Sequence, residues 1–136
     1  MIYLDSAAVV KLVRQEECSA DLVSWLNSHG EVPLASSALV EVEVPRALRR
    51  SAPQALIGVP AAVGRLFRLE IDSTVRATAA AFAEPMLRSL DAIHLATAQV
   101  LTNESGTTLV AFVSYDRRLL DAAKAAGFPV ASPGQN

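Results

Sequence analysis

Apolar residues in this chain gather in five short runs, which are separated by segments with helical periodicity. The runs predict strands at residues 2–4, 32–35, 66–71, 109–113 and 128–131, the last of them at a sheet edge. Residues 109–113 are apolar without interruption, which is typical of a strand buried on both faces of a parallel sheet. The second strand is expected to be brief, because Pro33 has no N–H to donate to a neighbouring strand.

The segments between the runs predict helices, most of which follow an Asp or Ser that suits a helix N-cap. They are expected at residues 7–13 after Asp5 and Ser6, at 19–28, from Ser36 or Ser37 to about Arg50, at 73–83 after Asp72, at 90–101 after Ser89, and between Asp116 and Gly127. Pro45 lies inside the third of them, where it is expected to kink the helix or to free the carbonyl of Glu41. Residues 52–63 predict a short helix or a loop, and residues 103–108 predict a polar loop.

Strands that alternate with helices predict an α/β fold in which a mainly parallel central sheet is flanked by helices. A length of 136 residues fits a single domain that spans residues 1–136. In such sheets, ligands bind beyond the carboxyl ends of the strands, where the strand order reverses. Asp5 and Asp116 follow two of the predicted strands, so both are expected at that edge.

Asp91 and Glu43 join Asp5 and Asp116 as candidate metal ligands. Asp5 and Asp116 also suit helix caps, and Asp91 also suits the positive end of a helix dipole. Asp91, however, lies in the strongly apolar segment 90–98, and a buried carboxylate has to be neutralised, hydrogen-bonded or bound to a cation. Oxygen ligands without a cysteine or histidine cluster favour Mg²⁺ or Mn²⁺.

Glu41 and Glu43 compete for one of these four positions. They lie two residues apart and therefore point about 200° apart around a helix, so only one can face a shared site. The apolar stripe of this helix, which includes Val40, Val44 and Leu48, lies between them. Periodicity leaves both glutamates open, and solvation at the edge of a packed helix would explain either one.

Three polar residues near the acids are possible auxiliary groups. His94 is one turn from Asp91 and could pair with it as an acid and base, but a lone histidine on a helix is more often a hydrogen-bonded structural residue. Ser6 and Ser114 could hold a metal-linked water, or serve as cap and turn residues. The sequence contains no serine–histidine–aspartate arrangement, glycine-rich phosphate loop or zinc-ligand spacing.

Charge does not mark the whole molecule as a nucleic-acid binder. The net charge is −2, from 12 Lys and Arg against 14 Asp and Glu, so binding to RNA would need a local basic patch. Two arginine groups could supply it: Arg46, Arg49 and Arg50, and Arg117 and Arg118. A solvated helix face explains either group without RNA.

Composition also bears on the cellular setting. The single cysteine, Cys18, cannot form an internal disulfide and fits a reducing compartment. No apolar run approaches the roughly 18 residues of a membrane span, and Asp5 interrupts what would be the start of a signal peptide. A cytoplasmic location is therefore expected, and the 51% hydrophobic content favours some surface that a partner covers.

Four blocks of the sequence together resemble the PIN-domain ribonucleases, most closely the VapC-type toxins of bacterial toxin–antitoxin modules. They are Met1-Ile2-Tyr3-Leu4-Asp5-Ser6, the segment from Ser36 to Val44, Leu90-Asp91-Ala92-Ile93-His94-Leu95-Ala96-Thr97-Ala98, and Ser114-Tyr115-Asp116-Arg117-Arg118-Leu119. The resemblance places the acidic quartet of the family on Asp5, Glu43, Asp91 and Asp116, and so selects Glu43 over Glu41. Two departures are Ala7, which replaces one hydroxyl of the family's opening, and Pro45, which could shift Glu43.

The resemblance implies a three-layer PIN-like domain and a metal-dependent endoribonuclease toxin that hydrolyses RNA phosphodiester bonds with Mg²⁺ or Mn²⁺. It also implies a homodimer and a cognate VapB-type antitoxin that blocks the site. The alternative is a catalytically inactive PIN-like module that binds RNA or protein, but such a module is expected to lack an acid, and none is missing. A phosphoacceptor receiver domain fits less well, because Asp5 stands alone and Lys124 lies well along the final helix.

Overall fold

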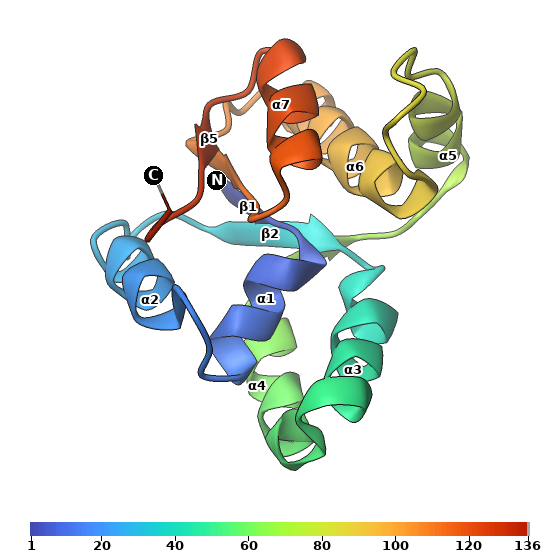
Figure 1. Ribbon diagram of the computed structural model, residues 1–136. Coiled ribbons are helices and arrows are strands. Elements are labelled where there is room, and N and C mark those ends of the chain that lie inside the picture. The colour runs from blue at the N-terminus through green and yellow to red at the C-terminus, as the bar shows by residue number, and fades with distance from the viewer. Residues whose placement is uncertain (136) are drawn as a thin grey trace.

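In the computed structural model, which describes residues 1–135, a five-stranded sheet forms the centre of the molecule (Figure 1). The strands are β1 (Ile2–Leu4), β2 (Leu34–Ser37), β3 (Phe67–Leu69), β4 (Ala111–Val113) and β5 (Val130–Ala131). All neighbouring strands pair in parallel, in the order β3-β2-β1-β4-β5. The predicted α/β fold with a mainly parallel sheet is therefore confirmed, and β5 is an edge strand as expected.

Helices cover both faces of the sheet. They are α1 (Ser6–Val13), α2 (Ser19–Asn27), α3 (Val40–Ser51), a 3-10 helix (Pro53–Gly58), α4 (Val59–Gly64), α5 (Ser73–Ala80), α6 (Ser89–Ser105) and α7 (Arg117–Ala125). Figure 1 shows α1 to α4 below the sheet and α5 to α7 above it. Within residues 1–135, none of these helices has the length and apolar character that crossing a membrane requires.

The two layers of helices bury separate parts of the core. Ile2 and Leu4 of β1 point toward α1 and α3, whereas Tyr3 between them packs with α6 and α7. This alternation follows from the two-residue period of a strand. All three side chains are fully buried, so β1 is covered on both faces and holds the residue that follows it, Asp5, in a fixed position.

The prediction for the second strand and the helix after it is wrong at its boundary. Ser36 and Ser37 belong to β2, which pairs with β1 on one side and β3 on the other. The Ser36 hydroxyl donates to the carbonyl of Leu4 at 2.6 Å, so its hydrogen-bonding capacity is used across the sheet. Helix α3 consequently begins at Val40 without a side-chain cap. The predicted strand ended too early because Ser36 and Ser37 also suit helix caps, whereas in the structure their polar groups are hydrogen-bonded within β2 and the turn after it.

The other boundaries follow the sequence more closely. Asp5, Asp72 and Asp116 each cap a helix through a side-chain oxygen, as predicted. Helix α5 ends three residues early, at Ala80. Helix α6 continues past the predicted end to Ser105, where Gly106 ends it with φ of 67°. Thr102 and Ser105 return their hydroxyls to carbonyls of the preceding turn, so the helix accommodates these polar residues and the expected loop is shortened to the residues after Ser105.

Candidate active site

The strand order reverses around β1, and the carboxyl ends of β1 and β4 lie side by side there. Leu4 is paired with Val113, so the residues that follow each strand emerge at the same edge of the sheet. Asp5 follows β1, while Ser114 and then Asp116 follow β4. This edge is where parallel sheets bind their ligands.

Asp5 is the most deeply buried of the four predicted acids, with 4% of its surface exposed. Its Oδ1 accepts a hydrogen bond from the backbone N–H of Ala8 at 2.9 Å, and its Oδ2 accepts one from the Ser114 hydroxyl at 2.6 Å. Burial raises the pKa of this carboxyl, an effect that outweighs the two hydrogen bonds, which lower it. The two hydrogen bonds therefore fix the position of Asp5, but they do not offset the cost of burying its negative charge.

Ser114 joins Asp5 to Asp116. Its hydroxyl donates to Asp5 and accepts a hydrogen bond from the backbone N–H of Asp116 at 3.1 Å. Asp116 in turn caps α7 through Oδ1, which accepts from the N–H groups of Arg118 and Leu119. Capping thus uses only one oxygen of Asp116. The other oxygen, Oδ2, faces the guanidinium of Arg88.

Asp91 approaches from the first turn of α6, in the opposite layer from α3. Its side chain is 21% exposed and lies beside the guanidinium of Arg88, which also lies beside Asp116. Burial is the main cause that raises the pKa of Asp91, and the negative charge of Asp116 adds to it, while Arg88 opposes both. As predicted, the helix behind Asp91 is buried along much of its length.

The structure distinguishes Glu43 from Glu41, which helical periodicity left equivalent. Glu43 Oε1 accepts hydrogen bonds from the Ser6 hydroxyl at 2.5 Å and from His94 Nε2 at 3.0 Å. Glu41 points away and forms an exposed ion pair with Arg68 at 3.0 Å. Burial pushes the pKa of Glu43 upward, but the hydrogen bonds from His94 and Ser6 outweigh it and lower the pKa. Glu43, and not Glu41, therefore lies with the other acids as a carboxylate.

His94 occupies a different place from the one its spacing indicated. Helical spacing allowed a pair with Asp91, but the hydrogen bonds of the ring go to Tyr3, Ser6 and Glu43. The ring is only 3% exposed, which fits the alternative of a hydrogen-bonded structural histidine. Helical spacing placed His94 near Asp91 in sequence, but the ring points past it to α3 and β1.

Sequence reasoning also missed Arg88. Its Nε lies 3.6 Å from Asp91 Oδ2, and its Nη2 lies 3.5 Å from Asp116 Oδ2. Arg88 lies three residues before Asp91, and this spacing was the available signal. The link to Asp116 depends on tertiary structure.

A divalent cation fits the chemistry of this edge. Among residues 1–135, no three of the acids and histidines already lie within common reach of one ion. Asp91 and Asp116, however, both face the guanidinium of Arg88, so two carboxylates already point toward one positive charge. Burial raises the pKa values of Asp5 and Asp91, so a bound cation would stabilise their ionised forms, and the carboxylates supply hard oxygen donors. Asp5, Glu43, Asp91 and Asp116 would hold the ion once the partly exposed side chains of Asp91 and Asp116 turn toward it.

The predicted arginines flank these acids on two helices. Arg117 and Arg118 directly follow Asp116 and are exposed at the start of α7. Arg46 lies one turn after Glu43 on α3, whereas Arg49 and Arg50 lie in the last turn of that helix. Arg46, Arg117 and Arg118 are therefore better placed than Arg49 and Arg50 to meet a phosphate at the acids.

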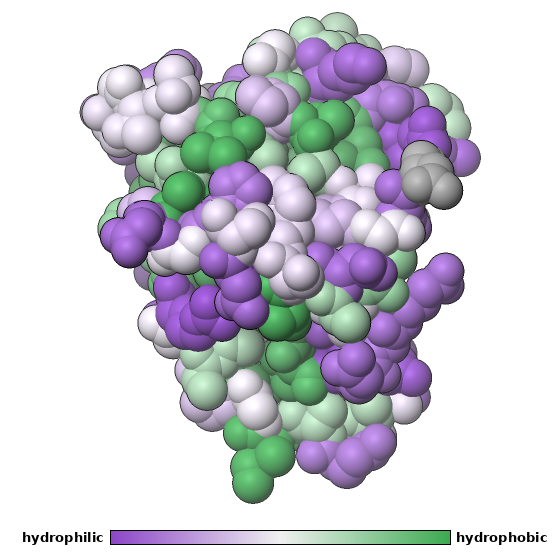
Figure 2. Space-filling view, turned by 90° about the vertical axis from the view of Figure 1, so that its left-hand side faces the viewer, coloured by the Kyte–Doolittle hydropathy of each residue, from purple (hydrophilic) through white to green (hydrophobic). Residues whose placement is uncertain are grey.

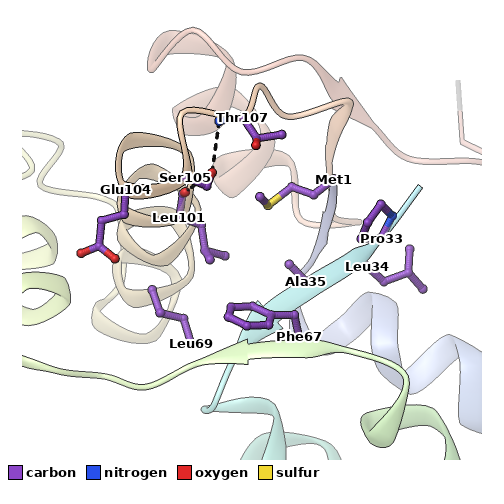
Figure 3. Close-up of a pocket in the computed structure, with 10 residues that line it drawn as sticks. All are labelled: Met1, Pro33, Leu34, Ala35, Phe67, Leu69, Leu101, Glu104, Ser105 and Thr107. Carbon is purple, nitrogen blue, oxygen red and sulfur yellow. Dashed lines mark hydrogen bonds between the residues drawn. The ribbon is translucent and has the colours of Figure 1, made fainter. Parts of the chain in front are cut away.

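A sizeable pocket lies away from this edge. A cavity of about 490 Å³ opens at the amino ends of β1, β2 and β3, between Met1, Leu34, Phe67 and Leu101 (Figure 3). Its lining side chains are mainly apolar, and Glu104 is its only acid. A cation site needs several oxygen donors, so the pocket does not compete with the acid cluster for that role.

Comparison with known proteins places the chain in a family. Residues 2–125 match the PIN domain family. Ribonuclease VapC35 of Mycobacterium tuberculosis is 51% identical over 135 residues, which cover 99% of this chain and 98% of that protein. Ribonuclease VapC46 of the same organism is 42% identical over 132 residues, or 97% of each chain. Ribonuclease VapC47 is 38% identical over 144 residues, or 98% of each chain. No solved structure matches the chain.

Proposed function

Because this chain belongs to the PIN-domain family as a ribonuclease of VapC type, we propose that it is an endoribonuclease toxin whose active site is formed by Asp5, Glu43, Asp91 and Asp116. The observation that supports this site best is the pairing of Asp91 and Asp116 around one guanidinium, at the edge where Asp5 is buried. RNA is the substrate, and the bond broken is a phosphodiester.

Mg²⁺ or Mn²⁺ is the proposed cofactor, and it supplies positive charge that activates water and stabilises the phosphate in the transition state. Ser114 fixes Asp5, and Ser6 fixes Glu43, through hydrogen bonds of 2.6 and 2.5 Å. These two hydroxyls thus orient carboxylates rather than reacting themselves. Arg46, Arg117 and Arg118 bind backbone phosphates of the RNA beside the acids.

The test of the proposed function is cleavage of total RNA by the purified chain, freed of its antitoxin, with Mg²⁺, Mn²⁺ or EDTA. We expect cleavage with either ion and none in EDTA, with activity restored when the ion is added back in excess. Cleavage that persists in EDTA would contradict the metal-dependent mechanism. Binding of RNA without cleavage in either ion would instead favour the inactive module.

Removal of Arg88 is expected to tighten the binding of a divalent cation. Arg88 is 74% exposed and places its charge where the ion has to bind, so Arg88→Ala removes a weak competitor. Exposed ion pairs contribute about 0.2–1 kcal/mol, which corresponds to an affinity gain of up to about fivefold. Titration calorimetry with Mn²⁺ measures this gain. Arg65→Ala, which removes the same charge from an exposed position at the end of α4, is the control and should leave the affinity unchanged.

Partners of this chain are proposed from its relatives and its surface. A VapB-type antitoxin that covers the acids and a second copy of the chain are the proposed partners. Val42 in the first turn of α3 is 61% exposed and Ile57 on the 3-10 helix beyond its other end is 92% exposed, so these two elements offer apolar side chains to a partner. In Figure 2 the lower end carries a hydrophobic protrusion, while hydrophilic residues interrupt the apolar ones above it.

A further inference from the structure

We propose that Tyr3 and His94 are positioning residues for Glu43: Tyr3 holds the imidazole in the tautomer whose hydrogen is on Nε2, and that hydrogen fixes the carboxylate of Glu43. This inference rests on the proposed function only in taking Glu43 as part of the active site. Its basis is a chain of hydrogen bonds that runs from the core below α6 to α3 in the opposite layer.

The donors in this chain can be assigned from the acceptors. A carboxylate only accepts hydrogen bonds, so His94 Nε2, at 3.0 Å from Glu43 Oε1, has to carry a hydrogen. Ser6 has a single hydrogen, which it donates to the same carboxylate oxygen at 2.5 Å. It therefore cannot also donate to His94 Nε2, although the two atoms are 3.0 Å apart. If Nε2 carried no hydrogen, it would lie beside two acceptor oxygens, those of Ser6 and Glu43, without a donor.

Tyr3 completes the assignment on the other side of the ring. Its hydroxyl lies 2.8 Å from His94 Nδ1, and a neutral imidazole with hydrogen on Nε2 has an acceptor at that position. Tyr3 therefore donates to Nδ1. Burial raises the pKa of the phenol well above its ordinary value, so the hydroxyl keeps its hydrogen. The two bonds together select one tautomer of His94.

The phenol is itself held by the core. Tyr3 is fully buried, and its ring stacks on Phe112 of β4 with a centroid distance of 5.0 Å and an interplanar angle of 14°. His94 meets the Tyr3 ring edge-on at 5.9 Å. Neither ring has space to turn, because protein interiors are close-packed. The position of Glu43, a partly exposed side chain, is thus set by the buried ring of His94 on α6, which Tyr3 of β1 holds.

The first test reads the tautomer directly. The chain has two histidines, so a long-range proton–nitrogen NMR spectrum of the metal-free protein contains one other ring, that of His29. At mildly alkaline pH we expect His94 to carry its hydrogen on Nε2, and Tyr3→Phe to shift the Nδ1 resonance, which loses its hydrogen bond, while His29 is unchanged. A His94 ring protonated on Nδ1, an imidazolium, or an Nδ1 resonance that is the same in Tyr3→Phe would each overturn the inference.

The second test follows the effect on the site. Loss of a partner that orients a ligand typically weakens metal affinity or activity about 10- to 100-fold, so Tyr3→Phe should weaken Mn²⁺ binding about tenfold and lower kcat, with KM for RNA unchanged. Tyr115→Phe is the matched control, because it removes a hydroxyl bonded to the carbonyl of Pro133 and should leave both values unchanged. His94→Gln keeps an N–H donor toward Glu43 and should retain more affinity than His94→Leu.

The outcomes separate this inference from the proposed function. If Glu43→Gln binds Mn²⁺ as the unmodified chain does, the site assigned to Glu43 is wrong. If Glu43→Gln loses binding while Tyr3→Phe and His94→Gln keep it in full, the site stands and the positioning role fails. Circular dichroism and thermal melting show that each variant is folded, and Tyr3→Phe, which keeps the stacked ring, tests the inference even if His94→Leu does not fold.

Discussion

Asp91→Asn is expected to lower the rate of RNA cleavage by more than about 100-fold, since loss of a ligand should exceed the 10- to 100-fold loss typical of the groups that orient ligands. Asparagine keeps the size and one oxygen of the side chain but removes the charge that a cation needs. The measurement is the initial rate of RNA cleavage in Mn²⁺, with the folded state verified by circular dichroism.

The same variant is expected to be at least as stable as the unmodified chain in the absence of metal. The pKa of Asp91 is raised in the folded state, so the folded chain holds the proton more tightly than the unfolded chain does. Its contribution to stability is therefore favourable at low pH and is lost as the pH rises through the unfolded and then the folded pKa. At neutral pH the ionised carboxylate is a cost that asparagine removes, while the lost pair with the exposed Arg88 is weak.

Mn²⁺ should reverse this order of stability. A ligand present at 100 times its dissociation constant stabilises the folded state by about 2.7 kcal/mol, so the melting temperature of the unmodified chain should rise with Mn²⁺ and that of Asp91→Asn should not. Asp121→Asn, an exposed change on α7, is the control and should behave like the unmodified chain. Undiminished cleavage by Asp91→Asn would exclude Asp91 from the active site.

Glu43→Gln and Glu41→Gln are expected to differ by at least about tenfold in cleavage rate. Glu43 is hydrogen-bonded beside the other acids, and its low pKa keeps it charged, so glutamine removes a negative charge from the site. Glu41 loses only an exposed pair with Arg68, which is worth about 1 kcal/mol or less of stability. Cleavage rates and Mn²⁺ titrations of both variants give the comparison.

These two variants carry the same chemical change, two residues apart on one helix, so each serves as the control for the other. If only Glu41→Gln lost activity while remaining folded, Glu41 and not Glu43 would be the glutamate of α3 that belongs to the site. Equal loss in both would point to a change in α3 as a whole, which thermal melting would detect.

Much of the fold is readable from local sequence because local rules decide it. The uninterrupted apolar run before Ser114 predicted a strand buried on both faces, and β4 is one. Asp5, Asp72 and Asp116 predicted helix starts because a short acidic side chain reaches the free N–H groups of the first turn. The acids at the strand ends were found in the same way, since Asp5 and Asp116 both cap a helix and face the edge of the sheet.

Other features could not be read locally because their partners are distant in the chain. Ser36 was taken for a cap, but its hydroxyl bonds to Leu4 across the sheet, which makes a polar residue compatible with a buried strand. His94 could pair with Asp91 by helical spacing, but its ring bonds to Glu43, 51 residues earlier. The second carboxylate partner of Arg88, Asp116, lies 28 residues later at the start of another helix, so local sequence does not reveal the pair.

The sequence by itself determined the alternation of strands and helices, three of the helix caps, and the resemblance that places the acids on Asp5, Glu43, Asp91 and Asp116. Periodicity and capping are properties of neighbouring residues, so a single chain without coordinates reveals them. Only the tertiary structure decided which glutamate of α3 faces the other acids, and which groups hold Glu43 there. The physical reason is that hydrogen bonds and burial between layers depend on how helices pack across the sheet, and that packing brings Glu43 to His94 and leaves Glu41 with Arg68.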